Sequence, residues 1–271
     1  FFPSKVSLSF KGMKDNLLYA FYSWPVPFVI YLNIWLSQRI IIEKLTVYDL
    51  GVYSAANVFV AIISVFQGGF GVYWSAFMFE NYKKKQDLII KVHDYLTFFI
   101  VAAMAILIIS QDLILALLGE KYQACKSFFG LVMVSPLLMM MSETTSYGIS
   151  LSKSAYWTVI AIVASTIFNI VGCVILIPIW GLQGAAISSL IAGLLQYTIR
   201  TVVGQRLYQS IARVSRMVFA VAIIVALAFA SWFLTKNGLS LKLVGFVGLL
   251  FALFIYRNLF KNILKKRQNN A

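Results

Sequence analysis

Charged residues, and acidic ones above all, are what this sequence has least of. Only 12% of its 271 residues are charged and 61% are hydrophobic, and Asp and Glu number 9 against 23 Lys and Arg. A soluble domain carries about twice that share of charged residues. The shortage excludes an ordinary soluble domain, and it indicates a membrane protein built from apolar spans of about 20 residues each.

Cysteine and histidine are also scarce. Cys125, Cys173 and His93 are the whole set, which excludes a CxxC redox pair and a metal site made of Cys and His. The HExxH, GxSxG, Walker and GxGxxG motifs are absent. The predicted external loops are too short to carry the catalytic carboxylates of a membrane glycosyltransferase. We therefore expect no enzyme activity, no metal and no cofactor.

The net charge of +14 does not indicate a nucleic-acid partner. The basic residues lie in short loops between apolar runs, without the interleaved stacking aromatics that single-strand binders use. Lys and Arg placed in this way are orientation signals that face the cytoplasm and its membrane lipids. We expect membrane lipids, and no nucleic acid, as partners.

The apolar runs predict eight transmembrane helices and hence an all-α integral membrane protein. The predicted spans are Leu17–Ile42, Gly51–Phe79, His93–Ile109, Phe128–Ile149, Ala155–Ile177, Leu182–Val203, Met217–Leu234 and Leu239–Leu259. With these spans, 17 of the 23 Lys and Arg fall on one side of the membrane and 6 on the other. The positive-inside rule then places both chain ends in the cytoplasm.

The first two spans contain residues that hydrocarbon disfavours. Pro25 and Pro27 lie in the first, and Gln67 precedes Gly68 and Gly69 in the second. Such interruptions are tolerated where a helix lines a cavity or packs on protein. One interpretation is a polar pathway whose walls bend at these prolines and glycines. The other is close helix packing through small residues.

Two ionisable residues within or near the spans are candidates for chemistry. Arg39 near the outer end of the first span suits a phosphate in a polar cavity, or it reaches the interface and sets topology. Glu143 lies about 15 Å deeper than Lys153 along a helix. It is either a carboxylate that couples transport to an ion or a neutral residue hydrogen-bonded to a neighbouring helix.

Several segments together resemble one family. They are the Pro25–Pro27 helix ending in SQRIII, then YDLGVYSAAN, VYWSAF before a basic loop, LLGEKYQAC, and the IPIWGLQGAA hairpin. In order and spacing they resemble the Wzx-type polysaccharide repeat-unit flippases of the multidrug/oligosaccharidyl-lipid/polysaccharide exporter superfamily. The resemblance covers nearly the whole chain. It departs from the family after Trp74, where Ser75 and Ala76 replace a frequent proline.

The resemblance implies a division of the chain. Residues 1–16 are a cytoplasmic or interfacial lead-in, 17–204 form the six-helix second lobe of the exporter fold, and 205–271 add two helices and a basic tail. The chain begins at Phe1 without Met, so we expect a first lobe upstream as a partner. The first two spans would face the central cavity, which gives a candidate set of Arg39, Asn33, Tyr53, Asn57 and Gln67.

The function implied is the flipping of oligosaccharide repeat units linked to undecaprenyl pyrophosphate. They would pass by alternating access from the cytoplasmic to the outer leaflet of a bacterial or archaeal inner membrane. The product would serve O-antigen, capsule or exopolysaccharide synthesis, with a polysaccharide polymerase as a further partner. Two alternatives stay open: a drug/cation antiporter of the same superfamily, which would want acidic cavity residues, and a non-transporting scaffold for a glycan-assembly complex.

Overall fold

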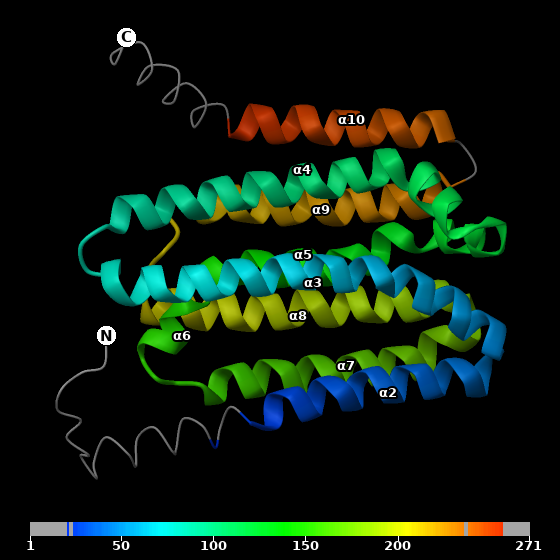
Figure 1. Ribbon diagram of the computed structural model, residues 1–271, viewed down its shortest axis with the longest axis horizontal. Coiled ribbons are helices and arrows are strands. Elements are labelled where there is room, and N and C mark those ends of the chain that lie inside the picture. The colour runs from blue at the N-terminus through cyan, green and yellow to red at the C-terminus, as the bar shows by residue number, and fades with distance from the viewer. Residues whose placement is uncertain (1–20, 22–23, 236–237, 257–271) are drawn as a thin grey trace, which may run out of the picture.

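The structure is a computed structural model that describes residue 21 and residues 24–235 and 238–256. The described part is helical throughout and contains no strand (Figure 1). Its elements are α2 (Pro25–Lys44), α3 (Val47–Asn81), α4 (Gln86–Leu118), the 3-10 helix η1 (Glu120–Ser127), α5 (Phe129–Thr145), α6 (Tyr147–Leu151), α7 (Tyr156–Trp180), α8 (Leu182–Leu207), α9 (Val214–Phe233) and α10 (Gly238–Ile255). The predictions for residues 1–16, for the start of the first span and for the basic tail lie outside the described residues.

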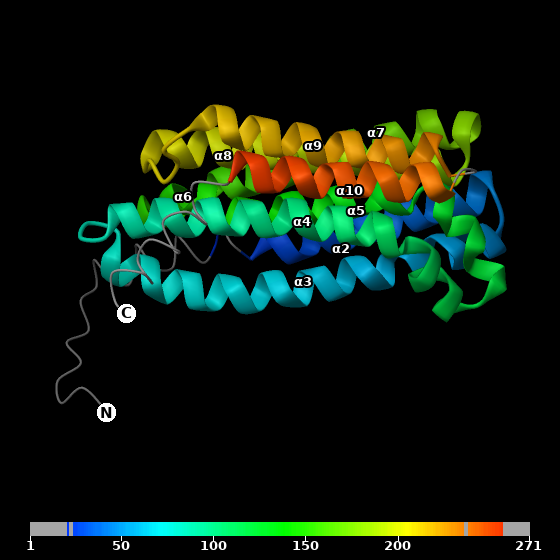
Figure 2. The same ribbon diagram turned by 90° about the horizontal axis from the view of Figure 1, so that it is seen from above.

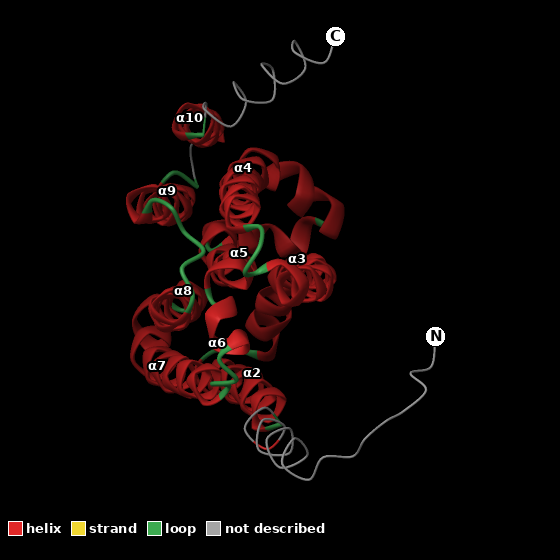
Figure 3. Ribbon diagram, turned by 90° about the vertical axis from the view of Figure 1, so that its left-hand side faces the viewer, coloured by secondary structure: helices red, strands yellow, loops and turns green. Residues whose placement is uncertain are grey.

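Helix α5 is the centre of the bundle. Its side chains are buried on every face, and it packs against α3, α4, α8 and α9, as the end-on view shows (Figure 3). A helix that is apolar all round is stable only where other helices or lipid cover it. The run FGLVMVSPLLMMM of α5 meets that condition, so the other helices are arranged around it.

Within the described residues, six helices are long and apolar enough to cross a membrane: α2, α3, α4, α7, α8 and α9. Helix α5 joins them only when it is counted with η1 across a bend of 68°, and the apolar stretch of α10 is shorter. The chain is therefore an all-α protein with several membrane-spanning helices. The expected count of eight spans is therefore not confirmed, because α5 is part of a bent pair and the apolar stretch of α10 is short.

Helices α2 and α3 form one edge of the bundle. Helix α2 packs mainly on α7, and α3 packs on α5. Figure 3 looks from the end opposite the α2–α3 turn and shows the two helices well apart. Helix α3 starts with a capping box between Thr46 and Asp49, which satisfies the first free N–H groups. The two predicted cavity helices thus diverge from a firmly capped turn.

The predicted fourth span, Phe128–Ile149, is interrupted at Ser146, between α5 and α6. Helix α8 crosses this break through Gly204, where a Cβ atom would lie 2.5 Å from the carbonyl oxygen of Thr145. Only a residue without a side chain allows two backbones to approach so closely. The crossing fixes how far α8 extends past the end of α5.

We expect the Gly204→Ala variant to be less stable by about 1–3 kcal/mol, the usual cost of overpacking. The added methyl group meets backbone atoms, which cannot rotate away. Thermal unfolding in detergent measures the effect. Gly51→Ala is the control, because no atom lies within 4 Å of a Cβ at that position of α3. Equal unfolding temperatures for the two variants would contradict the close crossing.

Candidate functional site

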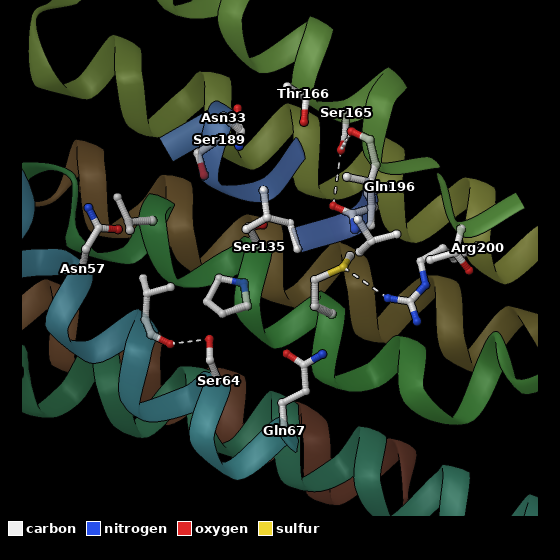
Figure 4. A pocket seen from close by; sticks show the side chains of 18 residues that line it. Asn33, Asn57, Ser64, Gln67, Ser135, Ser165, Thr166, Ser189, Gln196 and Arg200 are labelled. Carbon is white, nitrogen blue, oxygen red and sulfur yellow. Dashed lines mark hydrogen bonds between the residues drawn. The ribbon is translucent and has the colours of Figure 1, made fainter. Parts of the chain in front are cut away.

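A cavity of about 420 Å³ lies between α2, α3, α5, α7 and α8. Most of the residues that line it are polar, although all five helices are predominantly apolar. Figure 4 labels Asn33, Asn57, Ser64, Gln67, Ser135, Ser165, Thr166, Ser189, Gln196 and Arg200. Arg200 is the one charged side chain among the described lining residues. The cavity is thus a hollow of amides and hydroxyls with one cation.

Arg200 sits on α8 with most of its hydrogen-bonding capacity unused. One terminal nitrogen donates to Oγ of Ser146 at 3.1 Å, and the other faces the Met139 sulfur at 3.8 Å, which is a weak acceptor. Its Nε is enclosed and has no hydrogen-bond partner among the described residues. A guanidinium has five N–H donors, so this one is poorly satisfied by the protein alone.

No carboxylate of the described residues forms an ion pair with Arg200. The pairs that occur are Arg39–Glu43, Lys126–Asp112 and Arg216–Asp94. Glu143 acts on Arg200 electrostatically but lies beyond ion-pair distance. A half-buried cation without a paired anion is costly unless water or a ligand supplies the missing acceptors. The arrangement therefore provides an anion-binding position.

Glu143 is held just behind the cavity wall. Its Oε1 accepts a hydrogen bond of 2.9 Å from the side-chain amide of Gln67, which joins α5 to α3. A Cβ atom at Gly71 would lie 3.4 Å from Oε2, so the glycine leaves room for the carboxylate. Glu143 therefore makes a hydrogen bond to α3 and also acts electrostatically on Arg200 of α8. This placement fits both sequence interpretations, an interhelical hydrogen bond and a coupling group.

Asn33 belongs to a polar cluster that fastens α2 to α7. The side-chain amide of Asn169 donates to Oδ1 of Asn33 at 2.9 Å and to Oγ of Ser37 at 3.0 Å. Hydrogen bonds between helices replace those that water would supply outside the membrane. The cluster holds the α2 wall in place while Asn33 still lines the cavity.

Helix α5 contributes an irregularity of its own. Pro136 lies inside this helix and, with Val132, lines the cavity. Proline has no N–H, so the carbonyl of Val132 loses its usual donor four residues on. Beside it, Ser135 fits against Gly193 of α8, where a Cβ atom would lie 2.6 Å from the serine hydroxyl. This part of the cavity wall therefore combines a proline interruption of the α5 hydrogen bonds with close α5–α8 packing.

The structure brings three of the five predicted cavity residues together. Asn33, Asn57 and Gln67 line the hollow. Arg39 and Tyr53 are not among its lining residues: Arg39 is exposed, with its Nε 2.8 Å from Oε1 of Glu43, and Tyr53 stacks on Phe128 with ring centroids 5.9 Å apart. The geometry thus supports the topological interpretation of Arg39.

The predicted hinge residues also have defined places. Pro25 is the first residue of α2, and Pro27 lies in its first turn, so both begin the described helix instead of interrupting it. Gly68 and Gly69 lie inside the continuous helix α3, and no atom is within 4 Å of a Cβ at either position. Close helix packing is therefore not their role within the described residues.

Arg200 is the site residue that sequence reasoning missed. The predicted span Leu182–Val203 includes it, but the count of Lys and Arg places it, with Arg206, Arg213 and Arg216, among the 17 basic residues of the cytoplasmic side. A signal was present: Ser189, Gly193, Gln196 and Arg200 follow the four-and-three spacing of one helix face. A polar stripe along an apolar helix ends at this arginine, which places it at a cavity.

Comparisons of the chain with protein-family models, with curated protein sequences and with solved structures found no match. The cavity geometry and the sequence patterns are therefore what any functional proposal rests on.

We expect water to reach the cavity wall when the protein is in a membrane. In a background with Cys125→Ser and Cys173→Ser, the variants Asn57→Cys and Ser64→Cys should react with a charged, membrane-impermeant thiol reagent. Val65→Cys is the matched control, because this neighbouring side chain is 75% exposed on the outer, apolar side of α3. Thiol labelling in native membranes measures the difference. Equal labelling of positions 64 and 65 would contradict a hydrated hollow.

Proposed function

We propose that the chain is the cavity-bearing part of a flippase for oligosaccharides linked to undecaprenyl pyrophosphate. It would move them by alternating access to the outer leaflet of a bacterial or archaeal inner membrane, for surface polysaccharide synthesis. The observation that carries the proposal is Arg200, a cation without a paired carboxylate in a hollow lined by amides and hydroxyls. A diphosphate joined to sugars has the complementary chemistry, because phosphate suits the guanidinium and sugar hydroxyls suit the neutral polar wall.

The physical difficulty of the reaction is to carry charge and hydroxyl groups across about 30 Å of hydrocarbon. In our proposal the diphosphate binds Arg200, and the sugars replace their water with Asn33, Asn57, Gln67 and the cavity serines. The polyprenyl chain stays in lipid and leaves between α2 and α3, which diverge away from their turn (Figure 3). Movement of this lobe against a second lobe would alternate the access.

The proposal includes the finer arrangement of eight spans with both ends in the cytoplasm. Six spans would be the six long apolar helices, and the broken span of η1 and α5 and the short α10 would supply the last two. The basic α3–α4 turn and the residues around Arg206 and Arg213 would then face the cytoplasm. The cavity extends from Val26, Thr158 and Arg200, near helix ends that would be cytoplasmic, to Asn57 and Ser189 in the opposite half of the bundle.

Glu143 is the proposed coupling group. Protonation would remove the negative charge that acts on Arg200 and would change the field that a bound diphosphate feels. Its hydrogen bond to Gln67 would carry the same change to α3. A cation antiporter is the alternative that this carboxylate favours. Against it, no acidic residue is among the described residues that line the cavity.

The experiment that tests the proposal is complementation of a flippase-null strain with the full-length gene. We expect Arg200→Gln to lower surface glycan at least about tenfold, because a charged hydrogen bond is worth about 1.5–3 kcal/mol. Arg39→Gln is the matched control, since it removes an exposed guanidinium that is outside the cavity lining. Each variant is checked for normal amounts in the membrane. Full complementation by Arg200→Gln, or none by the wild-type gene, would refute the proposal.

Glu143→Gln tests the coupling role separately. The amide keeps the size of the carboxylate and can still hydrogen-bond to Gln67, but it cannot ionise. We expect flipping in proteoliposomes to persist at a lower rate and to become insensitive to an imposed proton or sodium gradient. The readout is the rate of substrate transfer with and without the gradient. A gradient response equal to that of wild type would exclude Glu143 as the coupling group.

A further inference from the structure

The turn between α3 and α4 carries a second, separate concavity, also of about 420 Å³. Four lysines line it, together with Gln86 and Leu88: Lys83, Lys84, Lys85 and Lys91. Figures 1 and 2 show this turn projecting past the neighbouring ends of α5 and α8. The concavity therefore lies at the end of the bundle and does not belong to the cavity of Arg200.

The positive charge of this concavity exceeds the negative charge around it, and no ion pair of the described residues offsets it. All four lysines are exposed, and none is in any of the ion pairs among the described residues. Asp87 is the one acidic residue that lines the concavity. Four like charges around one hollow repel each other, and an anion placed among them relieves the repulsion. The shape and charge therefore favour an anionic ligand.

Hydrogen bonds within the α3–α4 turn and to the α8–α9 loop fix the backbone of the turn. The backbone N–H groups of Lys84 and Lys85 both donate to the carbonyl of Asn81, at 2.9 Å each. The hydroxyl of Tyr208, in the α8–α9 loop, donates to the carbonyl of Tyr82 at 2.7 Å and also contacts the side chain of Gln86. The amide of Gln86 in turn donates to the carbonyl of Gln209. The lysines are thus presented by a fixed backbone, which lowers the entropic cost of binding.

An apolar stripe continues from the lysines along α4. Leu88, Tyr95, Phe99 and Ile106 follow at intervals of seven, four and seven residues, which puts them on one face of the helix. Their side chains are exposed by 42, 38, 60 and 54% respectively. Tyr95 stands between the cationic end and the apolar remainder, where an amphipathic ring fits the membrane interface. The order of cations, tyrosine and then apolar groups matches a headgroup followed by an acyl chain.

We propose that this surface binds an anionic phospholipid. The headgroup phosphate lies among Lys84, Lys85 and Lys91, and one acyl chain lies along the stripe of Leu88, Tyr95, Phe99 and Ile106. A soluble phosphate would use only the lysines, and a zwitterionic lipid would bring a phosphate whose charge its own cation offsets. An anionic phospholipid uses both, because each basic residue near the membrane surface attracts anionic lipid. This inference does not depend on the proposed flippase function.

The test measures lipid binding to the full chain in detergent by native mass spectrometry. Phosphatidylglycerol is titrated against phosphatidylcholine with the same acyl chains. We expect wild type to bind phosphatidylglycerol at least about tenfold more tightly, and Lys84→Gln, Lys85→Gln, Lys91→Gln together to abolish the preference. The matched control removes three exposed basic residues elsewhere, Lys153→Gln, Arg206→Gln and Arg213→Gln, and should keep the preference.

Two further measurements distinguish a lipid headgroup from a soluble phosphate as the bound anion. Glycerol 3-phosphate, a soluble phosphate ester without acyl chains, should fail to displace the lipid. Tyr95→Ser with Phe99→Ser should weaken phosphatidylglycerol binding at least about fivefold. Displacement by glycerol phosphate, or an unchanged affinity in the stripe variant, would mean a site for soluble phosphate and would overturn the proposal. Equal losses in the two triple variants would mean general charge attraction and would overturn it as well.

Discussion

The structure depends on one constraint: a guanidinium placed inside an apolar bundle without a carboxylate to pair with. Arg200 donates one good hydrogen bond, to the hydroxyl of Ser146, and makes a weak contact with the Met139 sulfur. A charge so placed requires water or a bound anion. The hollow beside it, with amides and hydroxyls on its wall, satisfies that requirement. The polar interruptions in α2, α3, α7 and α8 follow from the same need, since each would be costly against lipid.

The central helix determines where this charge sits. Helix α5 is buried on all sides, and α8 approaches it closely at Gly193 and again at Gly204. These two contacts fix the position of α8 along α5 and hold Arg200 level with the break at Ser146. Glu143 lies one helical turn before the break and reaches Gln67 on α3. Close packing at Gly193 and Gly204 therefore positions Arg200 on α8 relative to Glu143 on α5.

Much of the architecture follows from sequence periodicity and composition, because apolar runs and turn residues report directly on burial. Asn33, Asn57 and Gln67 could be predicted as cavity residues because the family resemblance turns the first two spans toward a cavity and an amide inside an apolar run needs a polar environment. Arg200 could not be found by the same route, since an arginine near a span end fits the positive-inside rule equally well.

Arg39 is a cavity candidate that the structure leaves outside the cavity, because Glu43, one turn later, pairs with it at the surface. Whether Pro25 and Pro27 begin a helix or interrupt one depends on tertiary packing, which local sequence does not contain.

The most direct test of the central claim is the affinity of the purified protein for undecaprenyl pyrophosphate, with undecaprenol as the uncharged comparison. If Arg200 is the diphosphate ligand, Arg200→Gln raises the dissociation constant for the pyrophosphate at least about tenfold and leaves that for undecaprenol unchanged. Equal affinity of wild type and Arg200→Gln for undecaprenyl pyrophosphate would contradict the account.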